Sequence, residues 1–255
     1  MNGLMQWLLA PISGAAHHEI APWAFWHARL MVLAWAILLP LGVLVARFFK
    51  IMPGQDWPAV RDNKTWWHAH RVLQYGGMAL MLAGIGLAWG NARGVSQAAA
   101  WHAILGWGVL GLGLMQLASA WARGSKGGPT DVRLRGDHYD MTPGRVAFES
   151  VHKAGGYAAI LLSIATIVLG LVVADAPRWM GLALALWWLL LASAFVVLQR
   201  QGRCIDTYQA IWGPGSGTEA SRRRPVGWGI RRYTAPQWQR KFGPRRAPAA
   251  LHNDK

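Results

Sequence analysis

The chain has 255 residues, of which 53% are hydrophobic and only 15% are charged, and its net charge is +15. Soluble domains carry about a quarter charged residues, so this composition excludes an ordinary soluble protein and favours a membrane protein. A strongly basic chain can indicate nucleic-acid binding. Here the basic residues flank apolar segments, where they meet lipid headgroups instead. We therefore expect the lipid bilayer, and no nucleic acid, as a partner.

Residues 1–22 are predicted to form a short interfacial segment. The first ten, MNGLMQWLLA, are apolar but lack the positive start of a secretory signal, so a cleaved signal is the weaker alternative. A polar stretch with prolines follows and leads into the first long apolar run.

Five apolar segments come next, and each is about as long as a helix that crosses a bilayer core of about 30 Å. None contains Asp or Glu in its interior. The segments cover roughly residues 23–46, 66–89, 98–121, 151–174 and 179–199.

This pattern predicts an all-α integral membrane protein. Residues 23–174 are expected to form a four-helix core, residues 175–200 a fifth transmembrane helix packed outside it, and residues 201–255 a basic tail. The segments between and after the spans carry 4, 1, 5, 1 and 12 Lys and Arg in turn. Because basic loops stay cytoplasmic, we expect the N-terminus outside and the tail inside, in the inner membrane if the source is prokaryotic.

The tail includes the stretch RRRPVGWGIRRYTAPQWQRKFGPRR, which mixes Arg with Trp, Pro and Gly and has no clear helical period. It is interpreted as a partly disordered segment that lies on the membrane surface or docks a partner. A solvated tail that only sets orientation is an equal alternative. The single cysteine, Cys204, excludes a disulfide framework.

Four of the nine histidines lie near the beginnings of successive spans: His27, His70, His102 and His152. Successive spans run in opposite directions, so His27 and His102 are expected at the outer side of the membrane. By the same argument, His70 and His152 are expected at the inner side. Ionisable groups inside membranes are costly and usually functional, and four at matching depth are hard to explain as interfacial anchors.

Two imidazoles on facing helices can hold one haem iron from both sides, and helix bundles host cofactors in this way. Two such sites would lie on the order of 20 Å apart. Zinc or copper is the alternative, but a His pair without a nearby carboxylate or thiolate is a poor tetrahedral site. Glycines near the histidines are expected to leave room for a macrocycle: Gly76, Gly77, Gly84, Gly86, Gly106, Gly108, Gly155 and Gly156. The absence of a Cys-x-x-Cys-His motif excludes covalent c-type haem.

His68 and His70 cannot both face the bundle, because residues two apart lie about 200° apart around a helix. We choose His70, which lies deeper, and expect His68 at the surface. The neighbouring Arg71 can reach a haem propionate or a headgroup. The remaining histidines are not expected to be ligands: His17, His18, His138 and His252.

Four segments resemble, in order, the four core helices of eukaryotic-type cytochrome b561 domains. The first two are HARLMVLAWAILLPLGVLVARFFK, which begins with His and has a mid-span Pro, and WWHAHRVLQ, with Trp, then His, then Gln. The others are HAILGWGVLGLGLMQLASAWAR and VHKAGGYAAILLSIATIVLGL. The end of the first segment is most similar to the class associated with DOMON domains, which includes ferric reductases. No DOMON domain is expected here, since only about 22 residues precede the first span.

This resemblance implies two b-type haems, one held by His27 with His102 and one by His70 with His152, and one-electron transfer across the membrane. We expect a small-molecule or quinol donor on the cytoplasmic side and an unidentified acceptor, or a redox partner protein, outside. A basic ring that includes Arg71 and Lys153 would stabilise propionates and attract anionic reductants, although it could serve topology alone. Two alternatives stay open: a haem-bearing anchor subunit that passes electrons to a partner, and a bacterial-type b561 linked to quinone. A homodimer is also left open.

Overall fold

The computed structural model describes residues 3–15, 19–92, 96–215 and 217–243, and within these ranges the chain is helical and has no strand. One helical segment, η1, is a π-helix. The helices run over α1 (Gly3–Leu9), α2 (Pro22–Met31), η1 (Val32–Leu38), α3 (Leu39–Phe48), α4 (Thr65–Asn91), α5 (Gln97–Ala122), α6 (Asp137–Asp140), α7 (Pro143–Val173), α8 (Arg178–Arg200), α9 (Thr207–Trp212), α10 (Glu219–Arg222) and α11 (Ala235–Phe242).

Five helices are long and apolar enough to cross a membrane, which confirms the predicted all-α class and the five spans. The first of them joins α2, η1 and α3 into one helix from Pro22 to Phe48. Observed and expected bounds agree within a few residues except in α7, which begins at Pro143 rather than near residue 151. The Thr142 side chain caps α7 by accepting a hydrogen bond from the N–H of Arg145, and proline suits a first helical turn.

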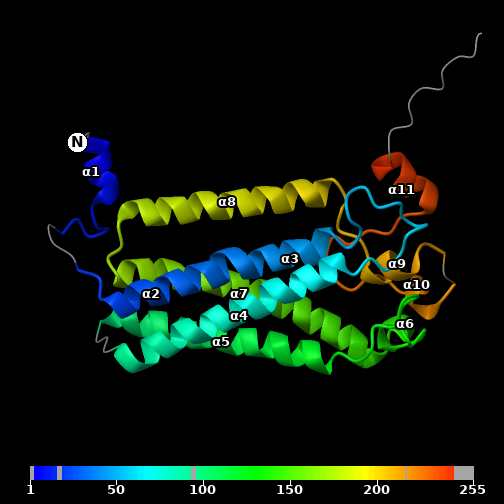
Figure 1. The fold of residues 1–255 in the computed structure, drawn as a ribbon, viewed down its shortest axis with the longest axis horizontal. Helices are drawn as coiled ribbons and strands as arrows, with labels where there is room; N and C mark the ends of the chain where they lie inside the picture. The colour runs from blue at the N-terminus through cyan, green and yellow to red at the C-terminus, as the bar shows by residue number, and fades with distance from the viewer. Residues whose placement is uncertain (1–2, 16–18, 93–95, 216, 244–255) are drawn as a thin grey trace, which may run out of the picture.

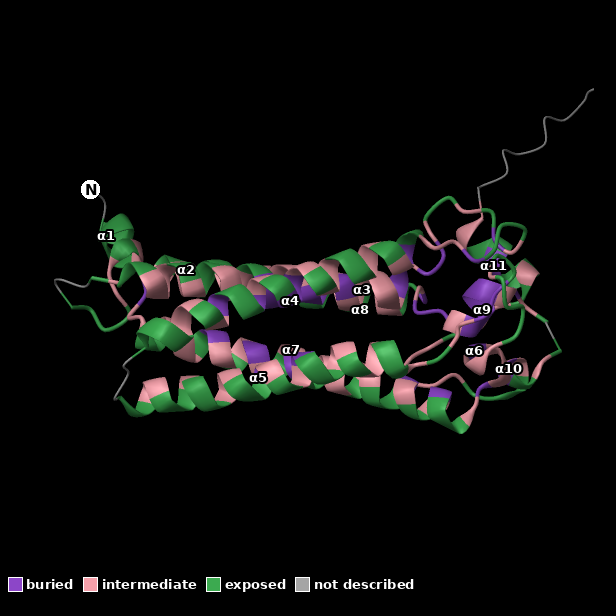
Figure 2. Ribbon diagram, turned by 60° about the horizontal axis from the view of Figure 1, so that its bottom comes forward, coloured by how far each residue is buried: buried purple, intermediate pink, exposed green. Residues whose placement is uncertain are grey.

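The four core helices form two layers (Figure 1). In one layer the first span packs along α4, and in the other α5 packs along α7. The layers meet mainly where α2, η1 and α3 contact α7. Figure 2 shows the buried residues on the inward sides of the helices and exposed residues on their outward sides. The outward faces are apolar, as expected for surfaces in contact with lipid.

The fifth span, α8, lies outside the two layers and against α3. It is attached to the first span at a backbone defect. Pro40 has no N–H and cannot donate to the carbonyl of Ala36. The indole N–H of Trp187 on α8 donates to this carbonyl at 2.7 Å. The missing N–H of Pro40 thus leaves the Ala36 carbonyl available to hold the extra helix.

A folded cap covers the end of the bundle at which α3 and α8 terminate (Figure 1). Its core combines distant segments, with Trp57, Ile205 and Trp238 packed together and Tyr208 buried beside them in a second cluster. Here the structure differs from the expectation of a partly disordered tail. Residues 201–215 and 217–243 fold because they bury apolar side chains against the segment that follows the first span. Residues 244–255 lie outside the described part of the chain.

At the opposite end, α1 turns away from the bundle near the start of α8 (Figure 1). Ser13 donates to the carboxylate of Asp175 at 2.5 Å, and the Arg178 guanidinium lies 5.1 Å from the Trp7 ring. The apolar side chains of Leu4 and Met5 are exposed. An interfacial role for this segment stays a prediction.

Candidate functional site

Of the four predicted ligands, His27 on α2 and His102 on α5 meet at the end of the bundle next to α1. Their ring centroids are 6.1 Å apart and the rings are nearly perpendicular, at 79°. A metal–imidazole bond is about 2 Å long, so this spacing is compatible with one metal ion between the two rings. We call this pair site A.

His70 on α4 and His152 on α7 lie at the end of the bundle next to the cap. Both line one cavity of about 500 Å³, within the range of about 300–1,000 Å³ typical of small-molecule and cofactor sites. Trp35, Met78 and Gly113 line its apolar part near the middle of the bundle. We call this cavity site B. Each site takes one histidine from each layer.

The histidines are held in place by their own layer. Nδ1 of His27 lies 2.8 Å from the Gly84 carbonyl oxygen, Nδ1 of His70 lies 2.9 Å from that of Gly42, and each contact requires Nδ1 to donate. In the second layer, Nδ1 of His102 donates in the same way to the Thr166 carbonyl at 3.0 Å.

His152 is held differently, by side chains of α5. Its Nδ1 lies 3.3 Å from Ser119 Oγ. In the orientation in which both the oxygen and the nitrogen of its side-chain amide form hydrogen bonds, Gln116 donates to the His152 carbonyl and to Nδ1, each at 2.9 Å. The Gln116 oxygen then accepts from the N–H of Gly156 at 3.2 Å.

For His27, His70 and His102, this arrangement fits a metal-bound cofactor. Metal-ligating histidines commonly donate the second ring N–H to a carbonyl, which fixes the tautomer and leaves Nε2 with a free lone pair. Within the described ranges, Nε2 of His27, His70 and His102 forms no hydrogen bond. The same ranges contain no group of three or more His, Cys, Asp or Glu that could hold a metal ion. What the chain offers is therefore paired imidazoles, which suit a cofactor that brings its other metal ligands with it.

At site B, each histidine packs near an aromatic ring, and an arginine lies over that ring. Trp67, one turn before His70, lies with its ring centroid 6.0 Å from the imidazole, and the Arg123 guanidinium covers the indole at 4.3 Å. On the other layer, Phe148 lies 5.1 Å from His152 and Arg145 lies 5.2 Å from the phenyl ring. Residues three or four apart share a helix face, so each aromatic ring limits the rotation of its histidine.

Site B carries an excess of positive charge. Glu149 is the one carboxylate among its described lining residues, and it pairs with Lys153 at 2.7 Å and with Arg145 at 3.2 Å. Lys126 pairs outside the cavity with Asp62 at 2.7 Å. The cationic lining residues are Arg47, Lys50, Arg71, Arg123, Lys126, Arg145 and Lys153.

Four of these cations have no carboxylate partner in the described part of the chain: Arg47, Lys50, Arg71 and Arg123. Burial, helped by nearby Lys153, lowers the pKa of Lys50 to about 8, and Lys50 donates to the Ile205 carbonyl at 2.8 Å. Burial, with Arg145 and Arg71 close by, lowers the pKa of Arg123 to about 10. An anion in this cavity would therefore be stabilised by charges that the protein leaves unpaired.

The two basic residues predicted near the inner haem, Arg71 and Lys153, both line site B. Arg71 lines the cavity and is exposed, whereas Lys153 is tied to Glu149 and to the Val226 carbonyl at 2.6 Å. His68 is exposed and does not line the cavity. His138 is buried in the cap, while His17, His18 and His252 lie outside the described residues.

Several site residues escaped the sequence analysis. Arg145 and Glu149 belong to the early turns of α7, which the apolar pattern missed, although Thr142 and Pro143 carry a helix-start signal. The carbonyls that hold the histidines have no sequence signature. The expectation that glycines leave room for a macrocycle needs correction at Gly84 and Gly155. A Cβ there would lie 2.7 Å from Met31 Cε and 2.5 Å from Gln116 Nε2, so these glycines serve close packing.

Known relatives agree with the resemblance seen in the sequence. No protein-family model and no solved structure matches the chain. A cytochrome b561, DM13 and DOMON domain-containing protein of Arabidopsis thaliana is 28% identical over 62% of this chain and 16% of its own length. A cytochrome b561 and DOMON domain-containing protein of the same plant is 32% identical over 57% of this chain and 27% of its own length. Ferric-chelate reductase 1 of Bos taurus is 30% identical over 57% of this chain and 22% of its own length.

The chain thus spans between a sixth and about a quarter of the length of these relatives. The predicted resemblance is confirmed, because its homologues are cytochrome b561 domain proteins and ferric-chelate reductases. Together with the five apolar helices, this homology supports an integral, multi-pass membrane protein.

Proposed function

We propose that the protein is a di-haem b-type cytochrome that carries electrons one at a time across the membrane. One observation carries the proposal. Two histidine pairs, each drawn from both layers, lie at opposite ends of the bundle. In three of the four histidines, a backbone carbonyl accepts from Nδ1 and leaves Nε2 free. The homology to cytochrome b561 proteins supports haem b as the cofactor.

His27 and His102 would hold the first haem, and His70 and His152 would hold the second. A bound b-type haem supplies reversible one-electron oxidation and reduction of its iron. The chain holds the imidazoles of His27, His70 and His102 by carbonyls that accept from Nδ1, which fixes the orientation of these rings. At site B, Arg71 and Arg123 would neutralise propionates, and Lys153 would act through its ion pair with Glu149.

Absorption spectra of the purified protein test this assignment. The reduced-minus-oxidised difference spectrum should show b-type bands, with two haems per chain. His70→Ala and His152→Ala should remove the same haem, and His27→Ala and His102→Ala the other. His68→Ala is the matched control and should retain both, because His68 is exposed and lies outside the cavity. Loss of a haem in the control with retention in His70→Ala would reverse the assignment of the ligand.

We also propose a direction for electron transfer across the membrane. The cap end carries most of the loop and tail cations, so we place it on the cytoplasmic side and site A outside. Electrons then enter at site B from an anionic or quinol reductant, because its unpaired cations raise the local concentration of anions. The acceptor at site A is a ferric chelate or a partner protein. The ferric chelate is suggested by the names of the ferric-chelate reductases among the relatives.

Vesicle experiments test the direction. In inside-out vesicles, an impermeant anionic reductant should reduce the haems rapidly, and more slowly as salt rises, because added salt screens the cations. Faster reduction in right-side-out vesicles, or a rate indifferent to salt, would contradict this direction while leaving the spectroscopic assignment intact.

A further inference from the structure

A second cavity, of about 650 Å³, lies on the cap and is unrelated to the histidine sites. Tyr233 stands at its centre, and the other lining residues are Arg231, Arg232, Gln237, Arg240 and Lys241. Two of these already have partners inside the protein. Arg232 donates to the Asp206 carboxylate at 2.6 Å, and the Gln237 side chain belongs to the capping box of α11.

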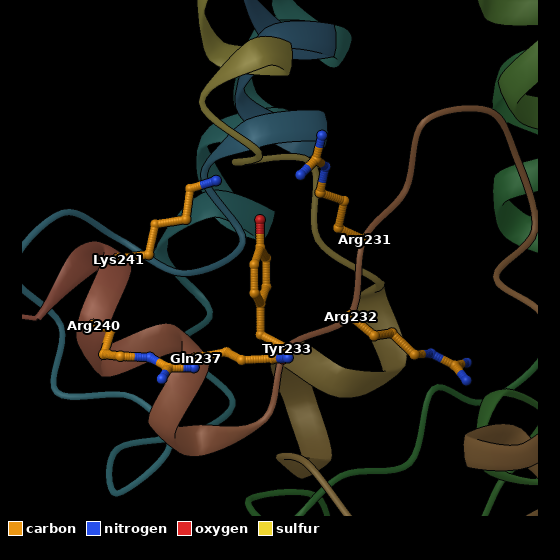
Figure 3. Close-up of a pocket in the computed structure, with 6 residues that line it drawn as sticks. All are labelled: Arg231, Arg232, Tyr233, Gln237, Arg240 and Lys241. Atoms are coloured by element: carbon orange, nitrogen blue, oxygen red, sulfur yellow. The ribbon is translucent and has the colours of Figure 1, made fainter.

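The remaining cations have no ionic partner among the described residues, although Lys241 Nζ lies 5.9 Å from the Tyr233 ring and 5.6 Å from the Phe242 ring. Across the described ranges, no carboxylate pairs with Arg231, Arg240 or Lys241, and all three are exposed. Figure 3 shows Arg231 and Lys241 pointing toward the same end of the cavity, on either side of the Tyr233 hydroxyl, whereas Arg232 points away. Like charges repel, so side chains converging in this way would be stabilised by an anion between them.

The cavity lies where the fifth span ends. Tyr233 donates through its hydroxyl to the carbonyl of Gly202 at 2.9 Å, two residues beyond the last residue of α8. A Cβ at Gly202 would lie 3.1 Å from Lys241 Nζ and 3.4 Å from Arg231 Cδ, so both side chains reach this point. The cations are therefore at the depth of lipid headgroups on the cap side of the membrane.

The surface below the cavity is apolar. None of the residues of α8 is buried, and Val196 and Val197 near its cap end are about half exposed. An acyl chain can lie along this face while its phosphate meets Arg231 and Lys241. A free phosphate would gain the ionic contacts but not the apolar ones.

We propose that this cavity, lined by Arg231, Tyr233 and Lys241, is a binding site for the phosphate of one anionic phospholipid. The lipid fastens the cap to the bilayer beside α8. The unpaired cations give affinity for the phosphate, and the exposed end of α8 favours a lipid over a soluble anion. This site is independent of the haems.

Native mass spectrometry in detergent tests the proposal with phosphatidylglycerol as the probe and phosphatidylcholine as the zwitterionic comparison. The wild-type protein should bind one phosphatidylglycerol tightly. Arg231→Gln/Lys241→Gln should bind it about tenfold or more weakly. The matched control Arg222→Gln/Arg224→Gln removes the same charge from exposed cap residues and should bind as the wild type does. Unchanged circular dichroism and haem content establish that the variants are folded.

Three results would overturn the proposal: equal binding by the wild type and Arg231→Gln/Lys241→Gln, an equal loss in the control variant, or equal binding of phosphatidylcholine. A comparison with inorganic phosphate provides a further test. If it raises the melting temperature as much as phosphatidylglycerol does at the same concentration, the site takes a soluble anion and the lipid assignment is wrong.

Discussion

At the scale of the residue, His138 contrasts with the four histidines of the bundle. It is buried in the cap, its Nδ1 lies 3.3 Å from a Glu149 carboxylate oxygen without hydrogen-bond alignment, and its ring packs against Tyr208. Nε2 has no hydrogen-bond partner within the described residues. Burial lowers the pKa of His138 below its usual value of 6.5, because a charged ring would lose its solvation.

This lowered pKa predicts a stability that depends on pH. Between the lowered pKa and 6.5, the unfolded chain binds more protons at this position than the folded chain does. The contribution of neutral His138 to the free energy of unfolding should therefore be fully present above pH 6.5. It should be lost as pH falls below 6.5, by at most about 1.4 kcal/mol per pH unit. His138→Phe should remove this part of the slope in thermal unfolding between about pH 7.5 and pH 5.5. The exposed His68→Gln is the control, and an unchanged slope in His138→Phe would contradict the prediction.

At the scale of the element, carbonyls of the first span accept from side chains of two other helices. In the π-helical segment, the Ala36 carbonyl accepts from Trp187 of α8. In α3, the carbonyls of Leu39 and Gly42 accept from Gln74 and His70 of α4. One helix therefore holds the fifth span and also orients a ligand of site B.

Trp187→Phe tests this attachment. The change keeps most of the ring but leaves the Ala36 carbonyl without its indole donor, which should cost about 1–3 kcal/mol because the carbonyl is buried. The loss should appear as a lower midpoint in unfolding by denaturing detergent and as faster proteolysis of the turn before α8. Trp179→Phe, at an exposed position on the same helix, should change neither. Equal effects of the two variants would mean that the hydrogen bond does not hold α8.

The elements that could be predicted are those with a strong sequence signal. A bilayer demands long apolar runs, so the spans were predicted closely, and the four histidines stood out against them. The cap was missed because its core joins Trp57, Tyr208 and Trp238 from segments far apart in the chain, and the helix-start signal of Thr234 and Gln237 before α11 was not used. The carbonyls that orient the histidines could not be predicted, since backbone acceptors depend on helix register rather than on residue type.

At the scale of the whole molecule, the two layers share few contacts, and every proposed ligand is anchored within its own layer. His27 and His70 are held in the first layer, and His102 and His152 in the second. Each site, however, needs one histidine from each layer. A group bound at either site would therefore join the layers, and both ends of the bundle would depend on it.

Haem removal should therefore loosen the contact between the layers. Binding to the folded state alone stabilises it by about 4 kcal/mol when free ligand exceeds its dissociation constant a thousandfold, so protein prepared under haem limitation should melt well below the loaded protein. Val109 lies in the buried cluster that joins the layers, and Ile51 lies in the cap core. In a Cys204→Ser background, maleimide should label Val109→Cys several-fold faster after haem removal. Ile51→Cys should label at an unchanged rate, because the cap core does not involve the histidines. Unchanged labelling at Val109→Cys, or equal acceleration at both positions, would mean that the cofactors do not join the layers.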